Sequence, residues 1–171
     1  MPLRPPRRYV RVPSLTARRW VGALLLAALV SGCGTAAQYR VPGDRLDRIR
    51  LLPPVAGTVS SGFGNRSGGR HAGIDILAPA GTEVRAASPG LAEYTGSGKR
   101  GYGRVVILDH GEGITTLYGH LAMIRVQSGE TVPAGAVIGT IGRSGNATTH
   151  HLHFELRVDG EAVDPIPYLN R

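Results

Sequence analysis

The chemistry available to this chain lies mainly in its histidines, which occur beside short β-strand patterns. The 171 residues include six histidines, and five of them stand at or beside the ends of predicted strands: His71, His110, His120, His151 and His153. Imidazole is the commonest protein ligand for zinc, and its charge changes near neutral pH. Metal binding and acid–base catalysis are therefore the first chemistries to consider.

The clearest histidine pair lies in the sequence HLHFEL, which begins at His151. Side chains alternate between the two faces of a β-strand, so His151 and His153 share one face while the leucines and the phenylalanine share the other. One face is then apolar core and the other carries two imidazoles. Such a pair can serve one metal ion, or can supply one ligand and one catalytic group. Taken alone, two surface histidines would be the simpler interpretation.

A histidine and an aspartate four positions apart follow a glycine-rich turn. An extended path over HAGID places His71 and Asp75 on a common side, and Gly73 between them leaves room for another group. Alone, this spacing is more often a surface pair. Together with His153, it supplies two nitrogens and one carboxylate oxygen, and three protein ligands leave a zinc ion with an open position for water or substrate. The combination predicts a catalytic zinc site.

His120 ends another strand pattern, ITTLYGH. Strict alternation predicts that one face of the strand carries Thr116, Tyr118 and His120. The other face then carries Leu117 and Leu121. His120 is then either a polar residue at the strand edge or an acid–base group beside the metal.

Short strand patterns separated by turns must position these residues. Alternating or β-branched runs occupy residues 82–86, 90–94, 104–109, 114–118, 136–141 and 152–158. Turn sequences containing glycine separate them, and no helical pattern of ten residues competes. We therefore expect an all-β domain, a compact antiparallel β-sheet or β-roll with short hairpins and long groove-forming loops. One such loop contains Tyr102, which either contacts substrate or belongs to a plain flexible hairpin.

A carrier domain is one alternative for this fold class, because residues 126–142 have the rhythm of the β-rolls in biotinyl and lipoyl carriers. Such carriers need a modified lysine. The only lysine, Lys99, lies in a glycine-rich stretch that does not suit this role.

The amino-terminal part of the chain has the layout of a secretory signal. A basic stretch ends at Arg19, the ten apolar residues VGALLLAALV follow Trp20, and small residues precede Cys33. A membrane-spanning helix needs roughly twenty apolar residues. The sequence VSGC, ending at Cys33, resembles a bacterial lipobox, in which the cysteine is lipidated. Signal cleavage that leaves a free cysteine is the alternative.

These features predict three parts of the chain: a lipoprotein-type signal peptide over residues 1–32, a lipid-anchored tether over residues 33–54, and one domain over residues 55–171. Lipidation would hold the domain at a membrane surface.

The net charge is distributed unevenly between the predicted signal peptide and the rest of the chain. The net charge is +8, but six arginines precede residue 21, which leaves 14 basic against 12 acidic residues from Cys33 onward. The domain therefore gives no indication of nucleic-acid binding.

Three sequence motifs together resemble the signatures of the lysostaphin-type, or LytM-like, zinc metallopeptidases. They are HAGID from His71, YGHL from Tyr118, and HLHFE from His151. The order, the approximate spacing and the intervening turns also match, over nearly the whole domain. The resemblance departs from the family pattern at Thr149-His150, where many relatives have Gly-Pro, so His150 receives no role.

The resemblance implies that His71, Asp75 and His153 bind Zn²⁺ and that His120 and His151 form the catalytic pair. For Glu155 two interpretations remain: a hydrogen-bond partner of the zinc ligand His153, or a surface carboxylate paired with arginine. The second is favoured.

The family also implies a peptide-bond substrate in peptidoglycan, either the stem peptide or its cross-bridge. We therefore expect a zinc metalloendopeptidase that is lipid-anchored in the bacterial cell envelope, with envelope proteins as possible regulators. Some relatives have lost ligands and act as non-enzymatic activators of cell-wall amidases, which is the alternative function. All five expected site residues are present here, which favours the enzyme.

Overall fold

The structure of the chain is a computed structural model that describes residues 45, 47–48, 50–98 and 101–169. Within these ranges, short β-strands follow one another along the chain, and the 3-10 helix η1 (Ile166–Tyr168) comes after the last strand. The strands are β1 (Thr58–Ser61), β2 (Gly64–Arg66), β3 (Gly69–His71), β4 (Ile74–Leu77), β5 (Glu83–Arg85), β6 (Gly90–Gly98), β7 (Gly103–Asp109), β8 (Ile114–Ile124), β9 (Thr131–Val132), β10 (Val137–Ile141), β11 (His151–Val158) and β12 (Glu161–Val163).

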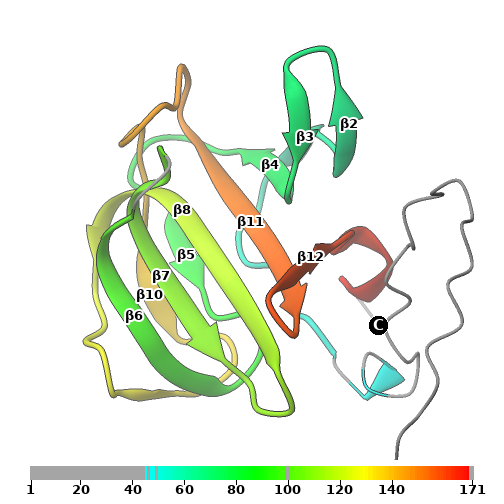
Figure 1. Cartoon of the computed structure of the whole chain (residues 1–171). Helices are drawn as coiled ribbons and strands as arrows, with labels where there is room; N and C mark the ends of the chain where they lie inside the picture. Colours follow the sequence, from blue (N-terminus) through cyan, green and yellow to red (C-terminus); the bar gives the residue numbers. More distant parts are fainter. Residues whose placement is uncertain (1–44, 46, 49, 99–100, 170–171) are drawn as a thin grey trace, which may run out of the picture. The chain divides into compact units, whose positions relative to one another are not determined.

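The strands pair antiparallel in one ten-stranded sheet and one small two-stranded sheet. The main path of the large sheet runs β1-β4-β11-β8-β7-β6-β9, while β2 and β3 form the separate hairpin (Figure 1). Because β10 pairs with both β8 and β5, the sheet folds back on itself. The expected all-β antiparallel fold is confirmed. The six predicted strand runs correspond to β5, β6, β7, β8, β10 and β11, with boundaries that differ by a few residues.

The hydrophobic core fills the inside of this folded sheet. Its largest buried apolar side chains come from β4, β7, β8, β10 and β11: Ile74, Leu108, Tyr118, Leu121, Ile138, Ile141, Leu152, Phe154 and Leu156. Burial of such side chains, at roughly 25 cal/mol per Å² of apolar surface, is the main stabilising term for a domain of this size.

Strand β11 lies between β4 and β8 and sets the positions of the site residues. It pairs with β4 on one side and with β8 on the other, and this register puts His153 opposite both Asp75 and Gly119. The apolar residues of β11 point into the core, as the alternation of HLHFEL predicts, while His151 and His153 line a cleft on the other face.

The core extends into the segment predicted as a tether. Leu51 is 1% exposed, belongs to the core cluster and forms a parallel bridge with Leu169 near the carboxyl end of the domain. The predicted signal peptide, Cys33 and Lys99 lie outside the described residues. In the part of the chain that the structure describes, no helix has the length and apolarity required to cross a membrane.

Candidate metal centre and catalytic pair

The structure brings His71, Asp75 and His153 together. His71 ends β3, Asp75 lies in β4 and His153 lies in β11, and one ligand atom from each falls within 4.8 Å of the others. The Oδ1 atom of Asp75 is 3.2 Å from Nε2 of His71 and 2.9 Å from Nδ1 of His153, and the two nitrogens are 3.1 Å apart. His71 and Asp75, which are four positions apart, thus meet His153, which lies 82 positions beyond His71.

Gly73 allows strand β11 to come close to the chain between His71 and Asp75. A Cβ atom at position 73 would lie 2.2 Å from the carbonyl oxygen of Phe154. The room that the sequence predicted beside Gly73 therefore exists, and the backbone of β11 occupies it. The glycine lets β11 come close enough to bring His153 beside Asp75.

Both histidines of this cluster direct one ring nitrogen to its centre and bond the other to the protein. Nδ1 of His71 donates to the carbonyl of Gly62 at 2.7 Å, which leaves Nε2 facing Asp75. Nε2 of His153 donates to Oε1 of Glu155 at 2.8 Å, which leaves Nδ1 facing Asp75. Metal-binding histidines usually have such a partner on the second nitrogen. Two imidazole nitrogens and one carboxylate oxygen are a donor set that fits zinc.

The charges in the cluster stabilise an ionised carboxylate. Burial acts to raise the pKa of Asp75, but the hydrogen bond from His153 and the neighbouring imidazoles outweigh it and lower that pKa. Burial acts to lower the pKa of His153, yet its hydrogen bonds to Asp75 and Glu155 raise it overall. The carboxylate of Asp75 is therefore ionised at neutral pH, as a metal ligand must be.

His120 and His151 form a second pair beside the cluster. Their ring centroids are 4.8 Å apart, and Nε2 of His151 is 3.7 Å from Oδ1 of Asp75. Nδ1 of each ring donates to a backbone carbonyl, that of Ser144 for His120 and that of Thr149 for His151. This fixes Nε2 as the nitrogen without a proton when the ring is neutral. Burial lowers the pKa of His120, which favours that neutral form.

The backbone at His120 corrects one prediction. Alternation placed Tyr118 and His120 on one face of the strand, but Tyr118 and Leu121 both lie in the core. His120 has a left-handed φ of 61°, and the pairing of β7 with β8 shifts register between Arg104 and Val106. This β-bulge turns His120 out of the core and aims it at the cluster, as bulges do beside many active sites.

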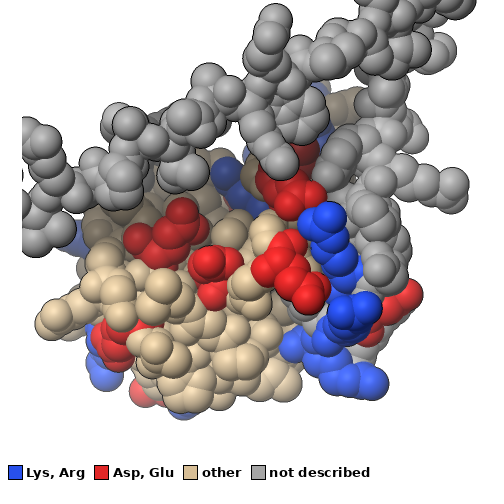
Figure 2. Space-filling view, turned by 60° about the horizontal axis from the view of Figure 1, so that its bottom comes forward, with Lys and Arg blue, Asp and Glu red and all other residues tan. Residues whose placement is uncertain are grey.

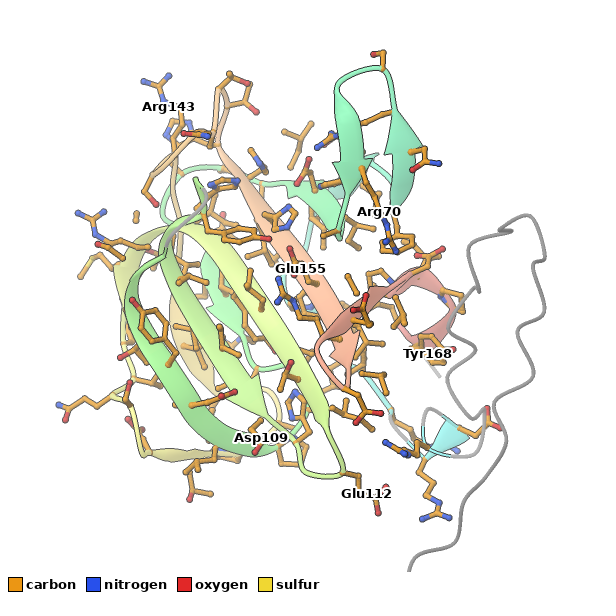
Figure 3. The ribbon with its side chains drawn as sticks, in the orientation of Figure 1. Arg70, Asp109, Glu112, Arg143, Glu155 and Tyr168 are labelled. Atoms are coloured by element: carbon orange, nitrogen blue, oxygen red, sulfur yellow. The ribbon has the colours of Figure 1, made fainter. Side chains whose placement is uncertain are left out.

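Glu155 is also placed differently from the favoured prediction. The interpretation as a surface carboxylate is wrong, because its side chain is 0% exposed, although the expected arginine partner is present. Its two oxygens accept four contacts: Oε1 from His153 and from the hydroxyl of Tyr102 at 2.7 Å, and Oε2 from two nitrogens of Arg157 at 2.6 Å. Figure 3 labels Glu155 partway along β11.

The cluster and the pair His120 and His151 line one polar cleft of about 320 Å³. Tyr102, Arg66, Asn146 and Thr148 complete its wall. Burial and the hydrogen bond to Glu155 raise the pKa of Tyr102 to about 12, so its hydroxyl stays protonated and donates. Of these four, the sequence pointed only to Tyr102, because Arg66 ends the short strand β2 and Asn146 and Thr148 lie in the loop before β11, and none of the three has a recurring spacing.

The remaining described histidines, His110 and His150, do not line this cleft. His110 bonds the carbonyl of Pro89 through Nδ1 and the hydroxyl of Thr116 through Nε2, which is a structural arrangement. His150 is exposed.

A hollow of about 460 Å³ at the other end of the sheet is lined by acidic residues, among them Asp109 and Glu112. Figure 2 shows acidic side chains gathered on that end of the molecule.

The chain is similar to several curated bacterial proteins. It is 41% identical over 124 residues to the DD-carboxypeptidase/endopeptidase Mpg of Neisseria meningitidis serogroup B, covering 69% of this chain and 28% of that protein. It is 42% identical over 118 residues to the lipoprotein NlpD/LppB homolog of Pseudomonas aeruginosa, covering 69% and 39%. It is 37% identical over 116 residues to the murein hydrolase activator NlpD of Salmonella typhimurium, covering 68% and 30%. The matches thus span about a third of these curated relatives.

Two solved structures have the same fold. The catalytic domain of the prophage-encoded protein EnpA of Enterococcus faecalis aligns with a TM-score of 0.61 and 36% identity, covering 66% of this chain and 91% of that one. The antimicrobial peptidase lysostaphin of Staphylococcus simulans aligns with a TM-score of 0.62 and 32% identity, covering 66% and 48%. The family model for peptidase family M23 matches residues 69–165, more than half of the chain. This chain belongs to peptidase family M23.

Proposed function

We propose that this chain is a zinc-dependent endopeptidase that hydrolyses stem peptides or peptide cross-links of peptidoglycan. The observation that carries the proposal is the convergence of His71, Asp75 and His153 within 4.8 Å, beside a second histidine pair in the same cleft. The donor atoms, their orientation and the open cleft suit a catalytic metal site better than a closed structural one.

In this proposal, His71 and His153 supply neutral imidazole nitrogens and Asp75 supplies one negative charge. A zinc ion held by this set would keep a formal charge of about +1, so it would polarise a peptide carbonyl and make a water molecule more acidic. Asp75 also faces His151 at 3.7 Å, so the same carboxylate helps to orient a member of the catalytic pair.

His120 and His151 are proposed to move the protons of the reaction. Their Nδ1 atoms are engaged with backbone carbonyls, so each ring offers Nε2 to the cleft. A neutral ring accepts a proton from water there, and the resulting imidazolium can then donate to the leaving amine or to the oxyanion. Because the backbone carbonyls hold the two rings in place, the reaction does not have to bear the entropic cost of ordering these side chains.

Peptidoglycan is the proposed substrate and the bacterial envelope the proposed location. One relative is named as a carboxypeptidase and endopeptidase, another as a lipoprotein and a third as a murein hydrolase activator. The predicted lipid anchor at Cys33 agrees with these names. A tether of roughly twenty residues would keep the domain within about 70 Å of its membrane, near the polymer.

A non-enzymatic activator of a cell-wall amidase is the second candidate. It is favoured by the 37% identity to the Salmonella activator. The complete set of ligands and catalytic histidines argues against it, because an activator has no need for a metal-binding triad with oriented tautomers.

Digestion of purified peptidoglycan by the full chain in detergent distinguishes the two functions. The enzyme is expected to release fragments with new amino termini in the presence of zinc, and His153→Ala is expected to release none. Fragment release only when an amidase is added, with equal effect from the parent and from His153→Ala, would support the activator and overturn the enzyme.

A further inference from the structure

Arg66 stands in the wall of the cleft that contains the candidate metal centre. Among the described residues that line this cleft, it is the only lysine or arginine. Its side chain is 51% exposed, so a molecule that enters the cleft can reach the guanidinium. The other described lining residues are histidines, one carboxylate and neutral groups. Arg66 therefore supplies a permanent positive charge to this part of the cleft.

The β2–β3 hairpin explains why Arg66 faces the cleft. In this hairpin Gly64 pairs with His71, and Arg66 pairs with Gly69. Directly paired residues share one face of a sheet, and so do residues two positions apart on a strand. Arg66 therefore lies on the same face as His71, the candidate ligand that ends β3. Figure 1 shows the hairpin to one side of the start of β11.

The contacts of Arg66 orient its guanidinium and leave most of its donors for a ligand. Nη1 donates to the hydroxyl of Ser61 at 3.0 Å and lies 3.9 Å from Oδ2 of Asp75. The second distance is longer than that of a hydrogen bond, so Asp75 attracts the guanidinium without binding it directly. A guanidinium has five N–H donors in a planar fork, and Ser61 occupies one of them.

The other arginine of the hairpin packs against the domain instead. Arg70 directly precedes His71 in β3, so its side chain points to the opposite face. Its guanidinium carbon is 5.5 Å from the ring centre of Phe63, and Nη2 is 3.5 Å from the carbonyl oxygen of Ala162 in β12. Figure 3 labels Arg70 between the hairpin and β12. Of these two arginines, only Arg66 lines the cleft.

A planar fork of donors in the wall of a cleft suits a carboxylate ligand. Arginine binds carboxylates through two parallel hydrogen bonds, and these charge-assisted bonds are stronger than those to neutral groups. The peptides of peptidoglycan contain free carboxylates beside their amide bonds. Arg66 lies 3.9 Å from Asp75, and one extended residue spans roughly 3.5 Å. A carboxylate bound by Arg66 would thus lie within about two residues of the bond that is cut.

We propose that Arg66 is a specificity-determining residue whose guanidinium binds a free carboxylate of the substrate peptide near the bond that is cut. The substrates are then peptides with an anionic group at that place, and amidation of this group makes a peptide a poorer ligand. This inference rests on the proposed function, because it concerns the substrate of the same cleft.

Two forms of one substrate test the proposal. Cross-linked peptidoglycan fragments are purified, and half of the sample is treated with carbodiimide and an excess of ammonia, which converts free carboxylates to neutral amides of similar shape. Dissociation constants are measured by calorimetry in zinc buffer with the full-length His120→Ala chain in detergent, because this variant is expected to leave the fragments intact. The carboxylate form is expected to bind about 5- to 20-fold more tightly than the amidated form.

Substitutions in the same His120→Ala chain assign this preference to one residue. Arg66→Gln is expected to bind the two forms with equal affinity. Arg66→Lys keeps the charge but loses the planar fork, so it is expected to retain only part of the preference. Arg70→Gln is the matched control, because it removes the same charge from the other face of the same hairpin, and it should keep the full preference.

Hydrolysis provides a second measurement that separates recognition from a loss of structure. In the chain with His120 intact, Arg66→Gln is expected to raise KM for the carboxylate form, with kcat changed by less than about twofold. A merely structural role of Arg66 would instead weaken the binding of both forms by the same factor and leave their ratio unchanged.

The inference is overturned if the His120→Ala chain binds both forms equally, or if Arg66→Gln retains the full preference. Should Arg66→Gln fail to fold in thermal unfolding, Arg66→Lys decides: a preference reduced by at least about twofold supports the inference, and an unchanged one overturns it. If the parent hydrolyses neither form, the proposed function is rejected, while the binding preference still tests Arg66. If the parent hydrolyses both forms with the same kcat/KM, the proposed function stands and this inference falls.

Discussion

Gly73→Ala is expected to damage the metal centre through the backbone alone. The added Cβ would lie 2.2 Å from the carbonyl oxygen of Phe154, whereas Cβ atoms essentially never approach closer than 3.0 Å. The chain near position 73 and β11 must therefore separate by at least about 0.8 Å, the difference between these two distances. Zinc–ligand distances tolerate deviations of only about 0.2 Å. Asp75 and His153, which lie on the strands forced apart, would no longer share one ion in the same geometry.

The expected result is a loss of about 1–3 kcal/mol in the free energy of unfolding, as for other overpacked interiors, together with zinc binding weakened by at least about tenfold. Urea unfolding and chelator competition measure the two quantities. Gly68→Ala is the matched control, because its Cβ would meet nothing within 4 Å and its φ is not left-handed. The reasoning is refuted if Gly73→Ala binds zinc as tightly as Gly68→Ala.

Three further predictions follow from the site and the core. His120→Ala should keep most zinc binding and lose hydrolysis, whereas His153→Ala should lose both; equal loss of zinc in the two variants, measured by metal analysis, would contradict the division of roles. Burial lowers the pKa of His110 below its ordinary 6.5, so the neutral ring stabilises the fold fully above about pH 6.5, and this contribution is lost as the pH falls further, by up to about 1.4 kcal/mol per pH unit. Urea unfolding at pH 7.5 and 5.5 should show a smaller acid loss in His110→Asn than in the parent, and an equal loss would be inconsistent with this assignment. Tyr118→Phe removes the acceptor of the Ala87 backbone N–H in the core and should cost about 1–3 kcal/mol in urea unfolding; a neutral effect would show that another acceptor replaces the hydroxyl.

The parts of the fold that the sequence predicted well are those in which local alternation decides the outcome. In β11, every second residue is apolar, so burial of Leu152 and Phe154 follows directly from the pleat and leaves His151 and His153 on the other face. The convergence of His153 with residues near position 73 was expected only by combining motifs, because no local pattern specifies which strands become neighbours.

The errors arose where long-range contacts override the local pattern. The left-handed residue at His120 inserts a bulge that strict alternation does not contain. Glu155 looked like a surface residue because it shares the polar face of the strand with His153 and Arg157, opposite the apolar residues. Its burial depends on Tyr102, which reaches it from a loop far away in the chain. Leu51 lies in the segment predicted as a tether because that segment lacks an apolar periodicity, yet it packs in the core and forms a bridge with Leu169, a contact that no local pattern indicates.

Anomalous diffraction at the zinc absorption edge, from crystals of the chain grown with zinc, tests the central claim most directly. We expect one zinc ion per domain, bound at about 2.0–2.2 Å by Nε2 of His71, a carboxylate oxygen of Asp75 and Nδ1 of His153, with a remaining position open to solvent. An anomalous peak that lies away from these three residues, or a site closed by a fourth protein ligand, would contradict the account.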